Sequence, residues 1–335
     1  MEVDEFLRQT DIMLDVRTPS EFLQGHIPGA VSFPLFSDEE RKRVGTVYKQ
    51  KGKEDAVKLG LSLVGPHLLS FVEKTEFLVG PSRKVRLYCA RGGMRSSFLA
   101  WLLQTAGFDC TLLEQGYKAF RNWALSQFTV SYSFFVLGGF TGSGKTDLLH
   151  EIKNLNEQVI DLEQMANHRG SSFGHLGCSP QPSSEHFENI LALELSKCDL
   201  KRPLWIEDES RMIGLCHVPK KLWNQMMQAP FLWIERSKEE RLKRIVLNYG
   251  KYSIEDLTQA TQRLLKKIGF SKVQKIVQDI QNKEFESAFF AILEYYDKTY
   301  SYASQKIPRN RIDFFCIESD KQLVKELIGF SQDRV

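Results

Sequence analysis

The segment from Gly139 to Thr146 constrains the fold of this chain more than any other. It reads Gly-Phe-Thr-Gly-Ser-Gly-Lys-Thr and fits the phosphate-binding pattern G-x-x-x-x-G-K-[ST] at every fixed position. The apolar run 133–137 before it predicts a buried strand, and the residues from Lys145 onward predict a helix. A strand, a glycine-rich turn and a helix in this order are typical of α/β folds with a parallel sheet. We call this turn the P-loop.

The P-loop residues have defined expected roles. Backbone N–H groups of a glycine-rich turn at a helix N-terminus attract phosphate oxygens. The Lys145 ammonium would reach a terminal phosphate, and the Thr146 hydroxyl would ligate a magnesium ion. Asp208 is the expected second magnesium ligand, ahead of Glu207, because an acid at the tip of a neighbouring strand usually fills this role. The residues expected to hold a phosphate or diphosphate are Gly139, Gly142, Ser143, Gly144, Lys145 and Thr146.

A second phosphate-shaped loop lies earlier in the chain. Cys89 opens the sequence Cys-Ala-Arg-Gly-Gly-Met-Arg, which ends at Arg95 and which we call the cysteine loop. An apolar run before it predicts a strand, and residues 96–106 predict a helix. Backbone N–H groups and a helix N-terminus favour the thiolate, which is the reactive form of cysteine. Arg91 and Arg95 would grip an oxyanion. The loop therefore predicts an activated cysteine beside an anion site.

Strand and helix patterns alternate along both halves of the chain. A length of 335 residues favours two domains. We expect a first α/β domain over residues 1–128 and a second over residues 129–335, the latter with a helical C-terminal region. Both should contain parallel sheets.

Composition excludes several classes of protein. Hydrophobic residues make up 42% of the chain and charged residues 26%, as in ordinary globular proteins. We find no run of eighteen apolar residues and no secretory signal, so neither a membrane span nor export is expected. Six scattered cysteines without a C-x-x-C pair favour a reducing cytoplasm over a disulfide framework.

The net charge of +3 excludes a polycation, but the charge is uneven. Residues 231–275 contain eleven Lys or Arg against five Asp or Glu. This basic stretch is either a surface for nucleic acid or an ordinary solvated helix surface.

Further candidate ligand residues lie in two loops and after one strand. Loop 167–174 mixes hydroxyl, imidazole, guanidinium and glycine residues, as ligand-binding loops often do, although such a loop can equally be an ordinary connection. The run 207–211 follows a predicted strand. Arg236, with Arg241 and Arg244, stands where nucleotide kinases carry lid arginines, and would contact a phosphorylated ligand or an RNA backbone. The candidates from the loop and the run are His168, Arg169, Ser171, Asp208, Glu209 and Arg211.

Residues 10–125 resemble the rhodanese family of sulfurtransferases. This resemblance rests on the run 14–17, which contains Asp15 and Arg17, on residues 21–22, and on the runs 25–30 and 116–121. The cysteine loop departs from common single-domain rhodaneses, because its arginine lies one residue farther from the cysteine. The same spacing occurs in phosphatases with a rhodanese-like fold, and it suits a larger oxyanion than a lone sulfane sulfur. Tyr88 stands where those phosphatases usually have histidine.

Nearly the whole chain resembles the tRNA 2-selenouridine synthase family, a rhodanese domain fused to a P-loop domain. The resemblance rests on residues 44–50, 89–96, 138–146, 168–174, 181–183, 207–211, 213–214 and 295–297. It implies replacement of the 2-sulfur of thiolated wobble uridine in tRNA by selenium from selenophosphate, through an S-geranylated intermediate made from geranyl diphosphate.

By the same resemblance Cys89 is the selenation cysteine. Arg91 and Arg95 would hold selenophosphate, and the P-loop would hold the diphosphate of the prenyl donor. The expected partners are the tRNA anticodon region with its 2-thiouridine and an enzyme that supplies selenophosphate. No tightly bound cofactor is expected, with selenophosphate and geranyl diphosphate as co-substrates and Mg²⁺ as the expected ion.

Three alternatives remain open at the level of sequence. The first is an ATP-dependent tRNA sulfurtransferase or kinase fusion, in which the P-loop hydrolyses ATP. The second is a nucleotide-gated RNA-binding module whose cysteine is idle. The third is a cysteine phosphatase.

Overall fold

The computed structural model describes residues 1–306, 311–316 and 319–334. The chain divides into two compact units. Unit 1 comprises Met1–Gln127 together with Glu188–Leu193, and unit 2 comprises Phe128–Phe187 and Glu194–Val335. A short segment from the second half of the sequence thus folds with unit 1.

Unit 1 is built around a four-stranded sheet in which every neighbouring pair is parallel. Its strands are β1 (Ile12–Asp15), β2 (Val31–Ser32), β3 (Lys84–Tyr88) and β4 (Asp109–Leu112), in the order β2-β1-β3-β4. Its helices are α1 (Val3–Arg8), α2 (Pro19–Gln24), α3 (Asp38–Lys51), α4 (Lys53–Val64), α5 (Leu68–Val79), α6 (Met94–Thr105) and α7 (Gly116–Gln127), with 3₁₀ turns at Gly65–His67 and Gly80–Ser82. Parallel neighbours require crossover connections, which most of these helices provide.

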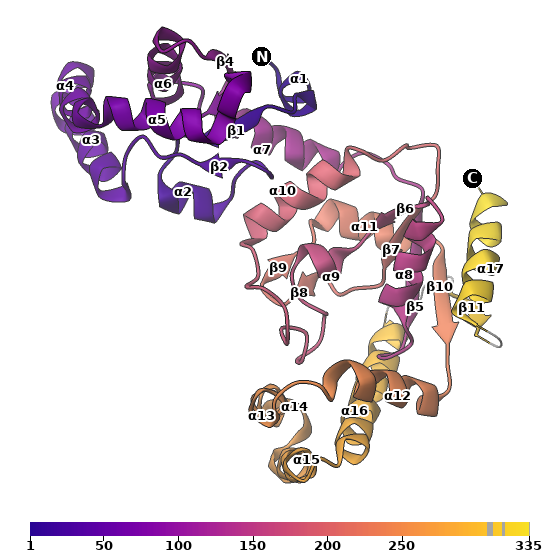
Figure 1. The fold of residues 1–335 in the computed structure, drawn as a ribbon. Coiled ribbons are helices and arrows are strands. Elements are labelled where there is room, and N and C mark those ends of the chain that lie inside the picture. Colours follow the sequence, from indigo (N-terminus) through magenta and orange to yellow (C-terminus); the bar gives the residue numbers. More distant parts are fainter. Residues whose placement is uncertain (307–310, 317–318, 335) are drawn as a thin grey trace. The chain divides into compact units, whose positions relative to one another are not determined.

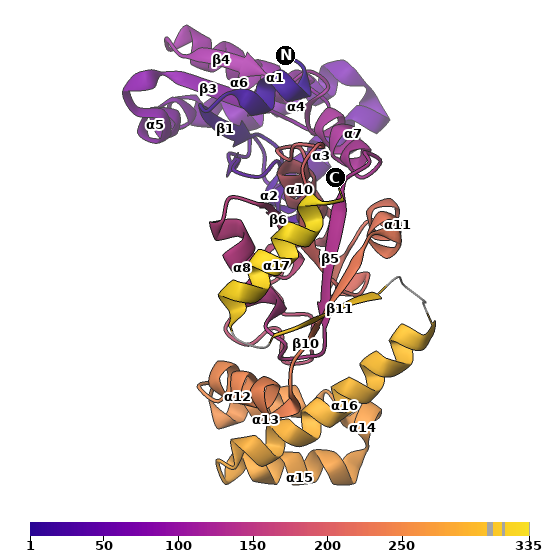
Figure 2. The ribbon, with the colours of Figure 1, turned by 90° about the vertical axis from the view of Figure 1, so that its right-hand side faces the viewer.

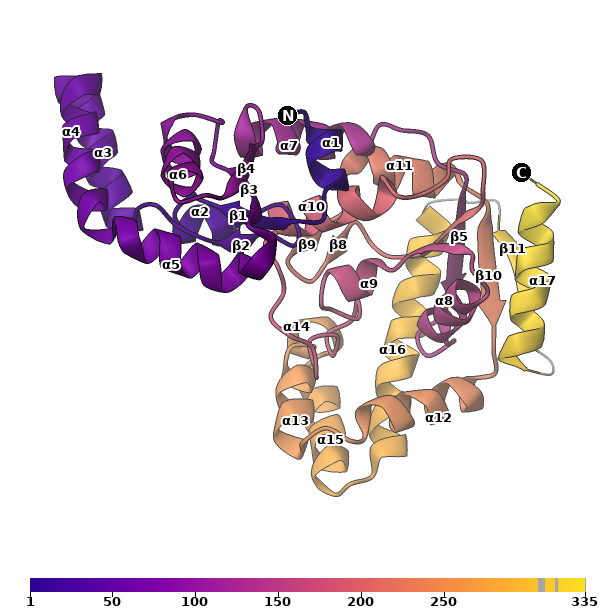
Figure 3. The same ribbon diagram turned by 45° about the horizontal axis from the view of Figure 1, so that its top comes forward.

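Local sequence signals set the helix starts in unit 1. Thr18 and Ser37 form capping boxes before α2 and α3, each with a glutamate three residues later. The helical pattern expected from Ser37 onward is interrupted at Gly52, where φ is +93°, so it forms the side-by-side pair α3 and α4 (Figure 3).

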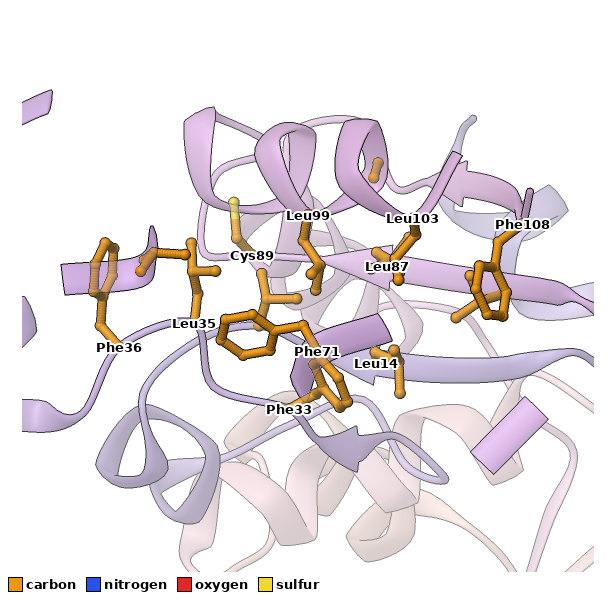
Figure 4. Packing of buried hydrophobic residues seen from close by; sticks show 14 residues of the cluster. Leu14, Phe33, Leu35, Phe36, Phe71, Leu87, Cys89, Leu99, Leu103 and Phe108 are labelled. Atoms are coloured by element: carbon orange, nitrogen blue, oxygen red, sulfur yellow. The ribbon is translucent and has the colours of Figure 1, made fainter. Parts of the chain in front are cut away.

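The core of unit 1 surrounds the end of β3. Leu14, Leu87 and Leu99 are fully buried, and Phe71 of α5 packs against them. Cys89 lies at the edge of this cluster, and its sulfur points away from Phe71 (Figure 4). The core therefore fixes the base of the cysteine loop.

One continuous helical stretch of the described chain, Lys53–Ser82, is long and apolar enough to cross a membrane. The most apolar 18 consecutive residues of this stretch have a mean hydropathy of 1.2, and 22% of this segment is buried. The stretch contains Pro66 in its 3₁₀ turn and contributes Val64 and Phe71 to the core of unit 1. Core helices of globular proteins can have the same length and apolar composition, so this stretch is weak evidence for a membrane span.

Unit 2 is built around a five-stranded parallel sheet in the order β11-β10-β5-β7-β6. Its strands are β5 (Phe134–Gly139), β6 (Gln158–Ile160), β7 (Leu204–Glu207), β10 (Phe231–Glu235) and β11 (Arg311–Phe315), beside the antiparallel ribbon β8 (Met212–Ile213) and β9 (Cys216–His217). The first helices are α8 (Lys145–Asn154), α9 (Leu162–Met165) and α11 (Lys220–Gln228), while α10 (Ser184–Leu195) belongs in part to unit 1 through Glu188–Leu193. The later helices are α12 (Lys238–Tyr249), α13 (Ile254–Gln262), α14 (Leu265–Ile268), α15 (Phe270–Gln281), α16 (Phe285–Lys306) and α17 (Asp320–Gln332).

Two apolar clusters organise unit 2. In the first, α8 and α17 lie side by side and pack on the central strands through Leu148, Leu323 and Trp205 (Figure 2). In the second, α12, α13, α15 and α16 form a helical layer around Phe289 and Leu293 (Figure 1). The predicted class is confirmed, with two parallel α/β sheets and a largely helical C-terminal region.

Candidate anion sites in the two units

The cysteine loop presents hydrogen-bond donors to a buried sulfur. Cys89 is 3% exposed and follows β3 directly. Its Sγ accepts the backbone N–H of Gly93 and the hydroxyl of Ser96, each at 3.2 Å. Ser96 is 1% exposed and lies in the first turn of α6. The sequence reasoning did not single out this hydroxyl as a donor, although Ser96 directly follows Arg95.

These donors outweigh burial at Cys89. Burial raises the pKa of the thiol. The Ser96 hydroxyl and the backbone N–H groups of Ser96, Arg91 and Gly93 together lower it by more, so the pKa of Cys89 lies below its ordinary value. Burial instead raises the pKa of Cys110 and Cys216 to about 11. Cys89 thus differs from these cysteines by its donors.

The start of α7 holds the cysteine loop in place. Tyr117 N–H donates to Cys89 O at 2.8 Å, and Lys118 N–H donates to Ala90 O at 3.1 Å. Gly116 has φ +57°, and a Cβ there would lie 2.1 Å from Cys89 O. Only glycine permits this approach, because any side chain would collide with the backbone of the loop.

The arginines of the loop differ in their surroundings. Arg95 donates from Nη1 to Glu21 Oε2 at 2.7 Å and from Nη2 to Glu21 Oε1 at 3.3 Å. The side chain of Arg91 is exposed, while its backbone N–H serves Cys89. Both guanidinium groups belong to the loop, and their contact with an oxyanion stays a prediction.

Asp15 and Arg17 lie in a buried network. Arg17 Nη2 pairs with Asp15 Oδ2 at 2.6 Å, and the Tyr88 hydroxyl donates to the same oxygen at 2.7 Å. The guanidinium lies 3.7 Å from the ring centre of Tyr117. Since Asp15 is 0% and Arg17 4% exposed, these candidates brace the core of unit 1 from inside.

The P-loop connects β5 to α8 as the pattern predicts. Lys145 Nζ donates to Gly139 O at 2.9 Å. Gly144 has φ +84° immediately before α8. Ser143 is 1% exposed, and its Oγ has no hydrogen-bond partner among the described residues. A buried hydroxyl of this kind favours a ligand that accepts or donates a hydrogen bond at the turn.

Two of the arginines expected in a lid, Arg236 and Arg241, donate hydrogen bonds to the backbone of the P-loop. Arg236 Nε donates to Ser143 O at 2.7 Å, and its guanidinium pairs with Asp320. Arg241 Nη1 donates to Thr141 O at 3.2 Å, and Arg241 forms a two-pronged pair with Asp297 at 2.8 and 2.7 Å. These hydrogen bonds hold two carbonyl oxygens of the turn, those of Ser143 and Thr141.

Arg244 is paired in a similar way. It contacts Asp147 at 2.8 Å and Asp320 at 2.6 Å. The sequence reasoning did not foresee that Asp297 pairs with Arg241 or that Asp320 pairs with Arg244. Each aspartate lies more than fifty residues further along the chain than its arginine.

Glu163 of α9, rather than Asp208, is the acid beside Thr146. Thr146 Oγ1 lies 3.5 Å from Glu163 Oε2, while Asp208 Oδ2 accepts the Tyr300 hydroxyl at 2.7 Å. Glu163 also donates its backbone N–H to Glu207 Oε1 at 2.8 Å. Hydroxyl and carboxylate oxygens suit Mg²⁺. No metal-binding group of three or more His, Cys, Asp or Glu is present in the described part of the chain, so magnesium stays a prediction.

Burial dominates this acidic neighbourhood. It raises the pKa of Glu163, Glu207 and Glu209, and the neighbouring carboxylates add to the rise. Lys145 acts in the opposite direction on Glu163 and Glu209.

Loop 167–174 lies against these acids. Gly170 has φ +63°, and a Cβ there would lie 2.7 Å from both carboxylate oxygens of Glu209. Arg169 N–H donates to Gly174 O at 3.0 Å, and Ser172 N–H donates to the Tyr296 hydroxyl at 3.0 Å. The structure therefore brings this loop close to Glu209 and to Glu163 of α9.

Two other candidates from these segments have different settings. Burial lowers the pKa of His168, and the nearby His175 and Arg263 lower it further. The side chain of Arg211 is exposed just before β8.

The basic stretch is divided between paired and exposed charges. Arg236, Arg241 and Arg244 are in ion pairs. The exposed lysines are Lys243 of α12, Lys251 just after it, and Lys266, Lys267, Lys272 and Lys275 of α14 and α15. The exposed lysines, rather than the paired arginines, are the candidate surface for a polyanion.

In the comparison with known proteins, each half of the chain matches one family model. A family model described as "tRNA 2-selenouridine synthase AAA domain" matches residues 132–332, and a model of the rhodanese-like domain matches residues 2–122.

Three similar relatives are each named tRNA 2-selenouridine synthase. One from Shewanella denitrificans is 42% identical over 243 residues, which cover 71% of this chain and 65% of that relative. One from Pseudomonas putida strain W619 is 36% identical over 343 residues, covering 90% of this chain and 91% of the relative. One from Marinobacter nauticus is 35% identical over 332 residues, covering 89% of each chain.

Proposed function

Because the chain belongs to the tRNA 2-selenouridine synthase family, we propose that it converts 2-thiouridine at the wobble position of tRNA into 2-selenouridine, with selenophosphate as the selenium donor. The family is one of tRNA-modifying enzymes, and this chain carries both of its domains. We place its activity in the cytoplasm.

The observation that carries the proposal is the donor set around Cys89. A thiol that is 3% exposed would ordinarily be inert, yet three backbone N–H groups and the Ser96 hydroxyl lower its pKa. The loop that activates the sulfur also carries Arg91 and Arg95. These guanidinium groups would hold the phosphate part of selenophosphate while Cys89 serves the selenation step.

The P-loop supports a second step. In our proposal it holds the diphosphate of geranyl diphosphate while the sulfur of 2-thiouridine attacks the geranyl carbon and diphosphate leaves. Backbone N–H groups, Lys145 and the unpartnered Ser143 hydroxyl are the expected contacts. If Mg²⁺ takes part, Thr146 and Glu163 would hold it, and it would neutralise charge on the leaving diphosphate. The S-geranylated base is then the substrate for selenation, in which a C2–Se bond forms, the C2–S bond breaks and geranyl thiol leaves.

The test is mass analysis of nucleosides from 2-thiouridine tRNA. The tRNA is incubated with the protein and geranyl diphosphate, and selenophosphate is added second. We expect S-geranyl-2-thiouridine first and 2-selenouridine after the second addition. If the wild-type protein leaves the nucleoside unchanged but hydrolyses ATP with magnesium, the ATP-dependent alternative replaces this proposal.

Cysteine variants isolate the selenation step. Cys89→Ala should abolish 2-selenouridine formation while tRNA binding is kept. Cys110→Ala is the matched control, because Cys110 lies on β4 outside the loop and its pKa is raised rather than lowered. Selenation by Cys89→Ala at the wild-type rate would remove Cys89 from the mechanism.

A further inference from the structure

A small cavity of about 20 Å³ lies between the P-loop and the helical layer of unit 2. Four of its lining residues carry hydroxyl groups: Thr141 of the P-loop, Ser171 of loop 167–174, Tyr249 and Tyr296. Its apolar wall comes from α12 and α16 and includes Ile245, Phe289, Ile292 and Leu293.

The lining of this cavity favours a hydrocarbon. The four apolar residues are between 0% and 7% exposed and belong to the core of the helical layer. None of the described residues that line the cavity carries a charge. A charged group would lose its hydration here without a charged partner, whereas an alkyl chain gains free energy by leaving water.

The position of the cavity ties it to the anion site. Thr141 is the third residue of the P-loop, so a diphosphate held by that turn has the cavity as its neighbour. The same two helices also brace the turn, because Arg241 of α12 and Asp297 of α16 form an ion pair and Arg241 donates to Thr141 O. The helices α12 and α16 therefore contact the P-loop and also form the apolar wall of the cavity.

We propose that this cavity is the entrance of a subsite for the hydrocarbon chain of the diphosphate substrate, and that α12 and α16 set the accepted chain length. This inference rests on the proposed function, which supplies the prenyl diphosphate. A cavity of 20 Å³ has room for about one water-sized group. The chain therefore enters by repacking of the surrounding side chains, and Ile292 limits how far it reaches.

Calorimetric binding of a ligand series to the full-length protein tests the proposal. The ligands are inorganic diphosphate and dimethylallyl, geranyl and farnesyl diphosphate. The wild-type protein should bind geranyl diphosphate at least about tenfold more tightly than inorganic diphosphate, since each buried methylene adds affinity.

Substitutions at Ile292 should then change the preferred chain length. Ile292→Phe should weaken geranyl diphosphate about tenfold or more relative to dimethylallyl diphosphate, and Ile292→Ala should shift the preference toward farnesyl diphosphate. Both should bind inorganic diphosphate as the wild type does. Leu247→Phe is the control, because Leu247 lies on α12 and is 78% exposed.

The outcomes separate this inference from the function on which it rests. Tight geranyl diphosphate binding with the same chain-length profile in both Ile292 variants overturns the cavity assignment and leaves the function standing. Equal affinity of the wild type for geranyl and inorganic diphosphate overturns the apolar subsite. Failure of the wild type to bind any diphosphate refutes the geranyl step, and the inference falls with it.

A labelling experiment on the wild-type protein avoids any effect of substitution on folding. A prenyl diphosphate analogue with a photoreactive group at the chain end is cross-linked, and the labelled peptide is identified by mass spectrometry. Label on residues 245–249 or 289–296 supports the proposal. Label confined to other segments overturns it.

Discussion

The Ser96 hydroxyl is the donor to Cys89 that can be removed without changing the backbone. Ser96→Ala deletes the O–H that lies 3.2 Å from Cys89 Sγ and leaves the N–H of Gly93 at the same distance. Loss of a donor destabilises the thiolate relative to the thiol, so the pKa of Cys89 must rise. At neutral pH the reactive fraction of the cysteine then falls.

The size of this change follows from the geometry. A hydrogen bond to a charged group contributes about 1.5–3 kcal/mol, and one pKa unit corresponds to about 1.4 kcal/mol. The Ser96 hydroxyl also lies 3.2 Å from Gly93 O, and its one proton serves only one acceptor at a time. We therefore take the lower end and expect the pKa of Cys89 to rise by about one unit.

The assay is the rate of alkylation by iodoacetamide as a function of pH, with labelling at Cys89 quantified by mass spectrometry. Ser97→Ala is the matched control, because Ser97 is the next residue on α6 and its side chain is exposed. The Ser96→Ala profile should shift to higher pH by about one unit, and the Ser97→Ala profile should coincide with that of the wild type.

One result would refute this reasoning. If Ser96→Ala folds normally and its alkylation profile coincides with the wild-type profile, the hydroxyl does not stabilise the thiolate. The low pKa would then rest on the backbone N–H groups alone.

Three further predictions concern other contacts. Lys145→Ala should lower the affinity for inorganic diphosphate about tenfold or more in calorimetry, through loss of a charge-assisted hydrogen bond, and unchanged affinity would remove Lys145 from the anion site. Arg241→Ala leaves Asp297 without its partner and should lower the free energy of unfolding by about 3–5 kcal/mol in urea denaturation; a loss below about 1 kcal/mol would class the pair with exposed ion pairs. Asn189→Ala removes hydrogen bonds to His26 O and the Tyr117 hydroxyl and should cost about 2–3 kcal/mol by the same method, whereas an unchanged midpoint would contradict the importance of this buried amide.

The two loops could be predicted because their chemistry is local. A cysteine or glycine pattern between a strand and a helix determines the backbone that follows it, and both Cys89 and Lys145 lie where the sequence places them. The P-loop and the rhodanese-like segment are confirmed by family models over most of the chain.

Contacts between distant residues were harder to foresee. Arg236 carries no local sign that Asp320 will pair with it, so a lid role and a bracing role looked alike in the sequence. Glu163 follows a short strand without any motif, and only the fold brings it to Thr146. Asp208 had the expected position after a strand, but the hydroxyl of Tyr300, far along the chain, engages its carboxylate.

The inclusion of Glu188–Leu193 in unit 1 has a consequence for synthesis of the protein on the ribosome. Asn189 of this segment is fully buried and bonds the Tyr117 hydroxyl, and Arg121 pairs with Glu188 at 2.6 Å. Domains usually fold as units in the order in which they emerge. Here residues 1–127 leave the ribosome without the amide and carboxylate that complete α7. The nascent rhodanese-like half must wait for residues 128–187 to be made before its last helix acquires these partners.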